Sequence, residues 1–347
     1  MEQADTGHRL SLKASDLVAR AQCPVCGSPA REHFRAQVYG KARATDHFRC
    51  QACGLTYMDP VPTQLWYDTL YGDEFWERKS SIDVPSGGVW INERQWHKGL
   101  ARAEKYLGIL QRVAPGTRMK SVLEVGASFG LICTTVADAY GAEAFGIEPN
   151  HAAREFASRA SGATMVGQTA ADLDKWQPRA PVDLAIFSHV LENIVEPAAA
   201  LAAVHRKLNP GGLLLIEMSN CDIRPSTSMY HPNCFSAASL QLLLEKCGFR
   251  VIETLTSGRP TSLVLPIYLT VVAEAVEAPV AARVQSFPGA LAVKIRHFLY
   301  RVYYKSPLGK LDSKFTQRRY FGTSFVKSRV SKVKESLGRV QALARSA

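Results

Sequence analysis

The sequence predicts an α/β protein whose centre is a doubly wound sheet of seven strands, one of them antiparallel to the others. Between residues 119 and 275, short apolar runs alternate with stretches of helical periodicity, the pattern of parallel strands joined by helices. The last run follows its neighbour after a short break with Gly258 and Pro260, so it is expected to return along that neighbour as a hairpin. Cysteine pairs precede this region and a basic helical stretch follows it, so the sheet is expected to be flanked by two smaller parts.

Seven runs have the continuous apolar character of buried strands. They are Ser121–Val125, Ala144–Ile147, Thr164–Val166, Leu184–Phe187, Leu213–Met218, Arg250–Leu255 and Ile267–Ala273. Helical stretches lie between them, for example His151–Ala160 and Ala198–Leu208. Strands and helices therefore alternate through the whole region, without an internal repeat.

The most apolar segment of the chain, residues 262–282, includes Glu274, Glu277 and two prolines. Carboxylates and prolines argue against a membrane span, so a sheet strand is the better interpretation. The first twenty residues lack the apolar core that a secretory signal needs. A cytoplasmic protein is expected.

Two C-x-x-C pairs stand near the N-terminus, with 23 residues between them. Their members are Cys23, Cys26, Cys50 and Cys53. Gly27 and Gly54 directly follow the pairs, as a metal knuckle requires, and four thiolates supply the closed tetrahedral shell that structural zinc prefers. A redox dithiol would leave one pair unexplained. The sequence therefore predicts a structural zinc site, with His33 and His47 interpreted as surface histidines outside it.

A glycine-containing loop, VLEVGASFG, follows the first predicted strand at residues 122–130. Gly126 and Gly130 let the backbone pass close to a ligand, and the following helix would direct its first amides toward a polar group. Glu148 ends the next strand, where a carboxylate can accept both ribose hydroxyls of a nucleoside. A dinucleotide-binding G-x-G-x-x-G and a P-loop lysine are both missing from this loop.

The loop resembles the first motif of class I S-adenosylmethionine (SAM)-dependent methyltransferases, an acidic residue followed by G-x-G-x-G. Ser128 stands in place of the middle glycine. The resemblance implies a Rossmann-like fold, SAM as cofactor, Glu148 on the ribose and Asp172 beside the adenine edge; Asp172 would equally suit a helix cap. The cofactor-binding residues that it implies are Glu124, Gly126, Ser128, Gly130, Glu148 and Asp172.

Further segments resemble the same family in order along the chain. They are DLAIFSHVLENIVEP at 183–197, LNPGGLLLIEMSN at 208–220 and FSAASLQLLLEKCGFRVIE at 235–253. The phrase CGLTYMDPVP, followed by LYGDEFWE, is similar to bacterial methyltransferases with a zinc-ribbon-like N-terminus, among them sugar C-methyltransferases that act on nucleotide-activated deoxysugars. The acceptor implied by this resemblance is a sugar carbon or hydroxyl.

Residues able to remove a proton from the acceptor should lie past the carboxyl ends of the fourth and fifth strands. His189 follows the fourth strand, and His231 with Tyr230 lies in the loop after the fifth. Related sugar methyltransferases use a Tyr and a His in that later loop, so His231 is the favoured base, Tyr230 its partner and His189 a contact of the cofactor. Each histidine would equally suit a structural role. Glu192 could shape the same site, and Tyr71 could reach it from the N-terminal part.

The net charge of +11 is concentrated at the C-terminus, where residues 290–347 hold fourteen Lys or Arg and two acids. Such a tail can meet phosphate, anionic lipid or an acidic partner, and can equally be a solvated helical face. The segment KIRHFLYRVYYK mixes cations with aromatics, as helices that lie on a membrane surface do, so peripheral membrane contact is one hypothesis.

The leading hypothesis is SAM-dependent methyl transfer to a small-molecule or glycan-linked acceptor. One alternative is an RNA methyltransferase that grips phosphate with the zinc module and the tail. Another, suggested by Ser128 and Asn193, is a non-catalytic SAM-binding protein. The SHVL segment replaces the motif typical of base-amine methylation, which makes nucleic acid the less favoured acceptor. The oligomeric state is left open.

Four parts of the chain are expected. A zinc-binding module occupies residues 1–62, a helical linker or lid 63–118, the methyltransferase domain 119–275, and a basic helical extension 276–347.

Overall fold

The computed structural model describes residues 12–39, 42–74, 82–83, 90–91, 93–277 and 280–346. Its centre is a seven-stranded sheet with the order β10-β9-β8-β11-β12-β15-β14. The strands are β8 (Ser121–Val125), β9 (Glu143–Ile147), β10 (Thr164–Gly167), β11 (Val182–Ser188), β12 (Leu208–Ser219), β14 (Phe249–Ser257) and β15 (Tyr268–Ala275). Only β15 runs antiparallel to its neighbours within this sheet, which confirms the predicted fold class. All seven predicted runs became strands, and the apolar segment around residue 270 lies in the sheet.

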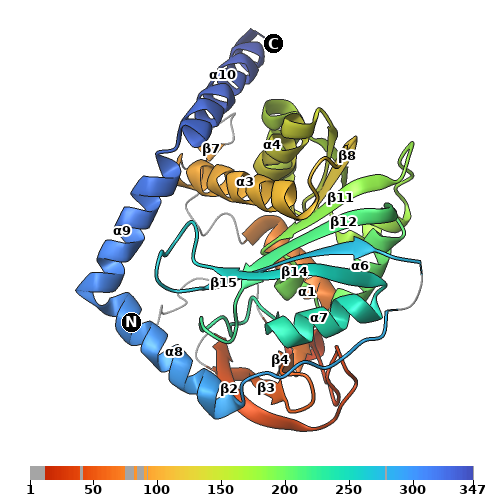
Figure 1. Ribbon diagram of the computed structural model, residues 1–347, viewed down its shortest axis with the longest axis vertical. Coiled ribbons are helices and arrows are strands. Elements are labelled where there is room, and N and C mark those ends of the chain that lie inside the picture. Colours follow the sequence, from red (N-terminus) through yellow and green to blue (C-terminus); the bar gives the residue numbers. More distant parts are fainter. Residues whose placement is uncertain are drawn as a thin grey trace.

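Helices cover both faces of the sheet (Figure 1). The covering helices are α3 (Glu93–Val113), α4 (Leu131–Tyr140), α5 (His151–Phe156), α6 (Pro197–His205) and α7 (Ala237–Lys246). Alternate residues of β11 explain the two layers: Leu184 packs with α3 and α4, whereas Ala185 packs with α6 and α7. Both faces of the central sheet are therefore buried under helices, as is typical of parallel sheets.

The N-terminal part forms a small antiparallel sheet of its own. Its strands are β2 (Arg31–Tyr39), β3 (Ala42–Cys50) and β4 (Thr56–Asp59), and it is followed by α1 (Gln64–Thr69) and a π-helical turn at Leu70–Glu74. β1 (Leu17–Val18) and β5 (Val61–Pro62) form a separate two-stranded antiparallel pair. The fourth strand of this sheet, β13 (Asn233–Cys234), comes from the loop that follows β12, so the module and the loop share one hydrogen-bonded structure.

The region 63–118, expected to be a helical linker, also contains a short strand pair. Ile82–Asp83 (β6) and Trp90–Ile91 (β7) pair antiparallel, and the residues between them lie outside the described part of the chain. The long helix of this region, α3, begins at Glu93, after this pair.

Three helices end the chain: α8 (Ala290–Lys305), α9 (Pro307–Phe321) and α10 (Ser324–Ser346). They pass along one side of the molecule from the N-terminal module to α3 (Figure 1). Val326 and Val330 of α10 are buried in a cluster with Trp96 of α3 and Phe129 of the glycine loop. Among the helices that the structure describes, none has the length and apolar character needed to cross a membrane.

Candidate active site

The glycine loop adopts left-handed backbone conformations at three positions. Gly126 and Gly130 have φ values of 74° and 71°, and Ser128 has φ 48°. A Cβ on residue 126 would stand 2.2 Å from a methyl group of Val190, so only glycine fits there. Ser128 holds this conformation at a cost of about 1 kcal/mol, so the loop keeps its shape without the usual middle glycine.

Glu148 ties the glycine loop to the end of β9. One carboxylate oxygen accepts from the Ser128 amide at 2.8 Å, and the other accepts from the Asn150 amide at 3.0 Å. The residue is buried, yet it lines the main cavity. Glu148 thus lines the cavity at the end of β9, and its contact with a ribose stays a prediction.

Glu124 lies beneath the same loop. Its carboxylate accepts from the Cys133 amide of α4 at 3.0 Å. Burial raises its pKa to about 8, and the nearby Glu148 carboxylate adds to the shift. A cationic ligand in the cavity would oppose both effects, because it stabilises the ionised carboxylate.

A cavity of about 1450 Å³ opens at the carboxyl ends of the parallel strands. One part is lined by the glycine loop, Glu148 and residues 168–171. The other part is lined by side chains from α3, β15 and the loops after β11 and β12. Chief among the second group are Arg102, His189, Glu192, Arg224, Tyr230, His231 and Tyr268. The cavity thus joins the predicted cofactor residues to the predicted acceptor-side residues.

Asp172 lies beside this cavity without lining it. Its carboxylate accepts from the amides of Gln168 at 2.8 Å and Thr169 at 3.0 Å, in a capping box that begins a 3₁₀ turn at Ala170–Asp174. Of the two roles that the sequence suggested for Asp172, the hydrogen bonds show the helix cap. Ala171 lines the cavity in its place.

His189 follows β11 with a φ of 60°, a strained conformation of the kind that clusters at functional sites. Its Nδ1 lies 3.4 Å from the Glu192 carboxylate, and its ring packs edge-on against Tyr268. Burial holds its pKa well below the ordinary value, and the cations around it, Arg102 first among them, lower it further. Burial raises the pKa of Glu192 to about 7.

His231 and Tyr230 lie in the loop between β12 and β13, and both line the cavity. His231 Nδ1 lies 2.6 Å from the Ser226 carbonyl. A carbonyl only accepts, so Nδ1 carries the proton and Nε2 carries the lone pair. This tautomer is the one that a general base needs.

The N-terminal part holds that loop through its backbone. Tyr67 donates to the Met229 carbonyl at 2.9 Å, and Tyr71 donates to the Tyr230 carbonyl at 2.8 Å. His47 bonds to the His231 carbonyl at 3.1 Å. Tyr71 also lines the cavity, so it reaches the site as the sequence suggested.

The prediction that His47 lies on the surface is wrong. His47 was interpreted as a surface histidine, whereas it is fully buried and burial lowers its pKa to about 4. Its strand is packed between β2 and β4 at the side that meets the His231 loop, so the ring faces the interior. His33 is exposed and bonds to Asp46, as expected of a surface histidine.

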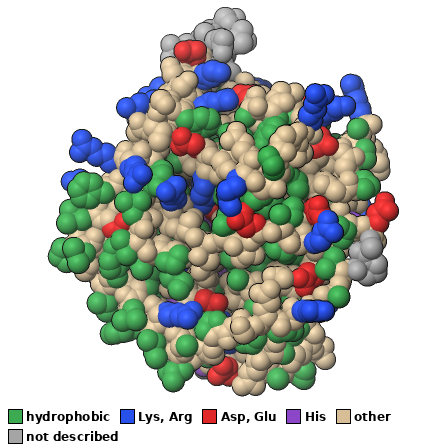
Figure 2. Space-filling view, viewed as in Figure 1, with side chains coloured by type: hydrophobic (Ala, Val, Ile, Leu, Met, Phe, Trp, Pro, Cys, Tyr) green, Lys and Arg blue, Asp and Glu red, His purple; other side chains and the backbone are tan. Residues whose placement is uncertain are grey.

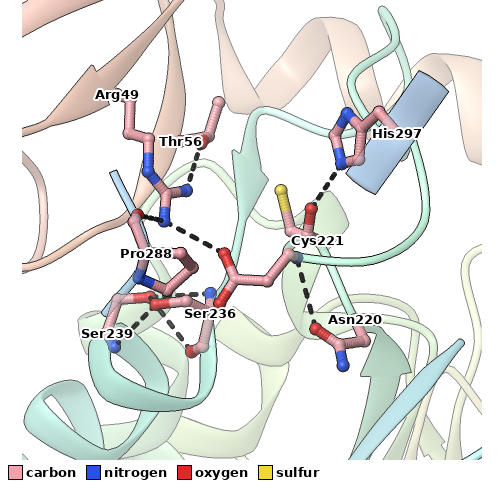
Figure 3. Close-up of polar contacts among 9 residues, drawn as sticks. Arg49, Thr56, Asn220, Cys221, Ser236, Ser239, Pro288 and His297 are labelled. Atoms are coloured by element: carbon pink, nitrogen blue, oxygen red, sulfur yellow. Dashed lines mark hydrogen bonds and ion pairs between the residues drawn. The ribbon is translucent and has the colours of Figure 1, made fainter. Parts of the chain in front are cut away.

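A second set of contacts joins the module to the start of the loop after β12 (Figure 3). Arg49 of β3 donates to the Asp222 carboxylate at 3.0 Å and to the Pro288 carbonyl at 2.8 Å. His297 of α8 bonds to the Cys221 carbonyl at 2.6 Å. Both ends of the loop are therefore fastened from outside the central sheet.

Several cavity residues were not singled out from the sequence. Arg102 on α3, Arg224 after β12 and Tyr268 at the start of β15 all line the acceptor side. Arg102 and Lys105 were part of a predicted helix, and their spacing places them on one face of it. Both approach the fully buried Glu217: Arg102 at 3.8 Å and Lys105 in close contact. Charged residues on the buried face of a helix are the signal that could have found them.

The four N-terminal cysteines form a compact cluster. Their sulfur atoms all lie within 4.8 Å of one another, with 3.6 Å between Cys23 and Cys53 and 3.5 Å between Cys26 and Cys50. A tetrahedron with zinc–sulfur bonds of 2.3 Å has edges of about 3.8 Å, so the spacing fits a metal and is far too long for disulfides. Gly27 and Gly54 turn the chain with φ values of 76° and 75°.

The central part of the chain is similar to a family of known proteins. Residues 99–254 match the family described as "Methyltransferase domain". A search of curated proteins gave no match. Among solved structures, the magnesium protoporphyrin IX methyltransferase of Synechocystis PCC 6803, with bound SAH, is 16% identical (TM-score 0.44; 61% of this chain and 100% of that chain covered).

Two other solved structures are similar over about half of this chain. A SAM-dependent methyltransferase from Archaeoglobus fulgidus is 17% identical (TM-score 0.42; 53% of this chain and 100% of that chain covered). One from Mesorhizobium loti is 19% identical (TM-score 0.39; 48% and 96% covered). The family match runs from within α3 to within β14, so it includes the glycine loop and leaves out β15. Residues 99–254 therefore match a methyltransferase domain, and the protein is assigned a methyltransferase activity.

Proposed function

We propose that this enzyme transfers the methyl group of SAM to a carbon or hydroxyl of a sugar in a small-molecule or glycan-linked acceptor. One observation carries the choice of acceptor. Three buried polar atoms of cavity-lining residues, Arg102 Nε, His189 Nε2 and Glu192 Oε2, have no hydrogen-bond partner within the described part of the chain. A ligand with several hydroxyls both donates and accepts hydrogen bonds, so it would satisfy all three.

The cofactor end is proposed to lie over the glycine loop. Glu148 would accept from the ribose hydroxyls, since its carboxylate already faces the Ser128 amide across the loop. The methionine moiety of SAM would lie against Glu124, Gly126, Ser128 and Gly130. The Asp172 cap would hold the turn beside the adenine. SAM supplies an electrophilic methyl group on its sulfonium sulfur.

The acceptor end is proposed to orient the attacking atom and remove its proton. His231 would accept that proton at Nε2, since the Ser226 carbonyl holds the proton of Nδ1. Tyr230 would position the acceptor beside it. His189, whose low pKa keeps its ring neutral, would line the site between cofactor and acceptor. A positioned base of this kind contributes about 10²- to 10⁴-fold in rate.

The four cysteines are proposed to hold a structural zinc ion. Cys23, Cys26, Cys50 and Cys53 give the closed all-sulfur donor set that zinc prefers, and the described part of the chain places no further metal-binding side chain in their cluster. The ion would fix the module whose β4 strand pairs with β13. Its role is therefore proposed to be positional, at the far end of the His231 loop.

An RNA acceptor is the less favoured alternative. Phosphate recognition calls for a continuous cationic surface. On α8 and α9 the cations are separated by exposed apolar side chains such as Phe298 and Leu299. The experiment below distinguishes a nucleic-acid acceptor from a saccharide.

The test uses purified full-length protein, SAM labelled in its methyl group and a cell lysate as the source of acceptors. The labelled products are separated into nucleotide-sugar, lipid-glycan and nuclease-sensitive fractions. Label in a saccharide fraction, lost by more than about 100-fold in His231→Ala but retained in the exposed-site control His33→Ala, is the expected result. Label that disappears on nuclease treatment, with none in any saccharide, would show that the acceptor assignment is wrong.

A further inference from the structure

We propose that the outer face of α8 and α9 docks this enzyme on the surface of an anionic lipid bilayer. Ten of the fifteen large apolar side chains that are exposed in the described part of the chain lie together there, each 48–73% exposed. We refer to them as the α8–α9 apolar stripe. The stripe consists of Leu291, Ile295, Phe298, Leu299 and Val302 on α8, Leu308, Leu311 and Phe315 on α9, and Leu263 and Val264 on the loop before β15.

The stripe is continuous across the three segments. Figure 2 shows apolar side chains gathered along the left edge of the molecule, where Figure 1 places α8 and α9. Leu263 and Val264 of the loop line one shallow hollow together with Leu308 and Phe315 of α9. Scattered single apolar residues need no explanation, but a contiguous patch of this kind marks a contact surface.

The opposite faces of both helices are anchored, so the stripe is held outward. On α8, Val293 and His297 are buried, and His297 bonds to the Cys221 carbonyl at 2.6 Å (Figure 3). On α9, the Asp312 carboxylate accepts from the Leu263 amide at 2.7 Å and contacts the Ser262 hydroxyl. The stripe therefore cannot turn inward without breaking these bonds.

Cations border the stripe along its length. With about 100° of rotation per residue, the five apolar side chains of α8 fall within an arc of about 100°. Lys294, Arg301 and Lys305 lie on one side of that arc and Arg296 on the other, all exposed. On α9 the exposed cations Lys310, Lys314, Arg318 and Arg319 accompany the stripe. Residues 290–321 contain eight cations and one acid, Asp312, which is engaged by the loop.

This arrangement selects among the possible occupants. A bilayer accepts apolar side chains at the level of its headgroups, and its anionic lipids meet cations at the border of the inserted face. A second copy of the chain would bring two sets of eight like charges together around the apolar contact. Nucleic acid would satisfy the cations but leave Phe298 and Leu299 without apolar partners.

Docking would also orient the catalytic domain. The loop that carries Leu263 and Val264 leads directly into Tyr268, which lines the acceptor side of the cavity. A bilayer that takes up this loop would therefore lie on the side of the molecule where the acceptor residues are. The proposal does not depend on the acceptor being a sugar.

Flotation of the full-length protein with vesicles tests this proposal. Vesicles of phosphatidylcholine alone are compared with vesicles that contain about one-third phosphatidylglycerol. The wild-type protein should float with the anionic vesicles at least about tenfold more strongly than with the neutral ones. The double variant Phe298→Ser/Leu299→Ser should lose at least about tenfold of that binding, whereas Ile252→Ser, an exposed apolar residue of β14, should not.

Two further measurements keep the result interpretable. SAM affinity and melting temperature should be unchanged in the double variant, because both side chains are exposed. Failure of the wild-type protein to float, equal flotation with both kinds of vesicle, or full binding by the double variant would each overturn the proposal. Sedimentation velocity identifies the main competing occupant: a wild-type dimer that becomes monomeric in the double variant, without vesicle binding, assigns the stripe to self-association.

Discussion

Two carboxylates at the glycine loop are expected to play different parts. Glu148 accepts two backbone hydrogen bonds, from Ser128 and Asn150, which keep its oxygens in place beside the cavity. Glu124 accepts one, and its burial holds its pKa near 8. An ionised Glu124 would suit a cationic sulfonium ligand.

SAM affinity should therefore rise with pH. Below about pH 8 the Glu124 carboxyl is protonated and gives a cation little attraction, whereas above that pH it is ionised. We expect the dissociation constant of SAM to fall by at least about fivefold between pH 6 and pH 8. Glu124→Gln should remove the part of this dependence that comes from the protein, and Glu143→Gln, an exposed glutamate on β9, should retain it. Calorimetric titrations at several pH values measure both; equal slopes in the two variants would contradict the assignment.

The raised pKa of Glu124 also makes the stability of the fold depend on pH. The folded-state pKa of Glu124 lies above its ordinary value of 4.5, so folding takes up a proton at this site. Its contribution to stability therefore falls as the pH rises from about 4.5 to about 8.

Single residues were predictable where one local rule fixes them. The left-handed turns at Gly126 and Gly130 and the knuckle turns at Gly27 and Gly54 follow from the need for glycine at positive φ. Arg102 and Tyr268 could not be predicted in the same way, since they reach the cavity from α3 and β15, which come together only in the folded sheet. His47 was misjudged for the same reason: its burial depends on contact with a loop 184 residues away.

At the scale of elements, the loop between β12 and β13 is held from outside the methyltransferase domain. Its end pairs with β4 of the N-terminal module, and Tyr67 and Tyr71 bond to its backbone carbonyls. The residues proposed to bind SAM instead lie on β8, β9 and the turns that follow them. The module should consequently affect the acceptor side of the cavity more than the cofactor side.

Loss of the proposed zinc ion should lower turnover without a matching loss of SAM affinity. We expect Cys26→Ser to lose its metal, measured by elemental analysis, and to lower kcat by about tenfold or more because the His231 loop loses its support. The dissociation constant of SAM should change by less than about threefold. Cys247→Ser, a half-buried cysteine at the end of α7 and outside the cluster, is the matched control. Full activity in a metal-free Cys26→Ser protein would refute the positional role.

For most strand ends, the predicted boundary lies within one or two residues of the observed one. The reason is that a buried parallel strand has a continuous apolar sequence. The exception was β12, which begins at Leu208 and not at Leu213, since its first residues include Pro210 and two glycines. The β13 strand was not predicted, because two residues carry no periodic pattern and its partner is 176 residues away in sequence, at Tyr57.

At the scale of the whole molecule, the C-terminal helices form a brace along one side of the catalytic domain. His297 fastens α8 near the loop after β12, Asp312 fastens α9 to the loop before β15, and Val326 packs α10 against the glycine loop. The basic tail, whose role the sequence left open, is thus part of the fold. Its cations were visible in the sequence, but its anchoring was not, because that depends on the long-range contacts of these three residues.

Truncation of a buried α10 side chain should destabilise the catalytic domain. Val326 is fully buried beside Phe129, so Val326→Ala should cost about 2 kcal/mol of unfolding free energy. Its exposed neighbour, in the variant Lys327→Ala, should stay within about 0.5 kcal/mol of the wild type. Chemical denaturation of the full chain gives both values. A loss below about 0.5 kcal/mol for Val326→Ala would show that α10 is not packed as described.

The proposed function requires that SAM occupy the cavity beside Glu148. Calorimetric titration of SAM into the wild-type protein, Glu148→Gln and the control Glu143→Gln measures this. We expect the wild type and the control to bind SAM, and Glu148→Gln to bind it about ten- to a hundredfold more weakly, since a hydrogen bond to a charged group is lost or weakened. Equal affinity in all three proteins, or no binding by the wild type, would contradict it.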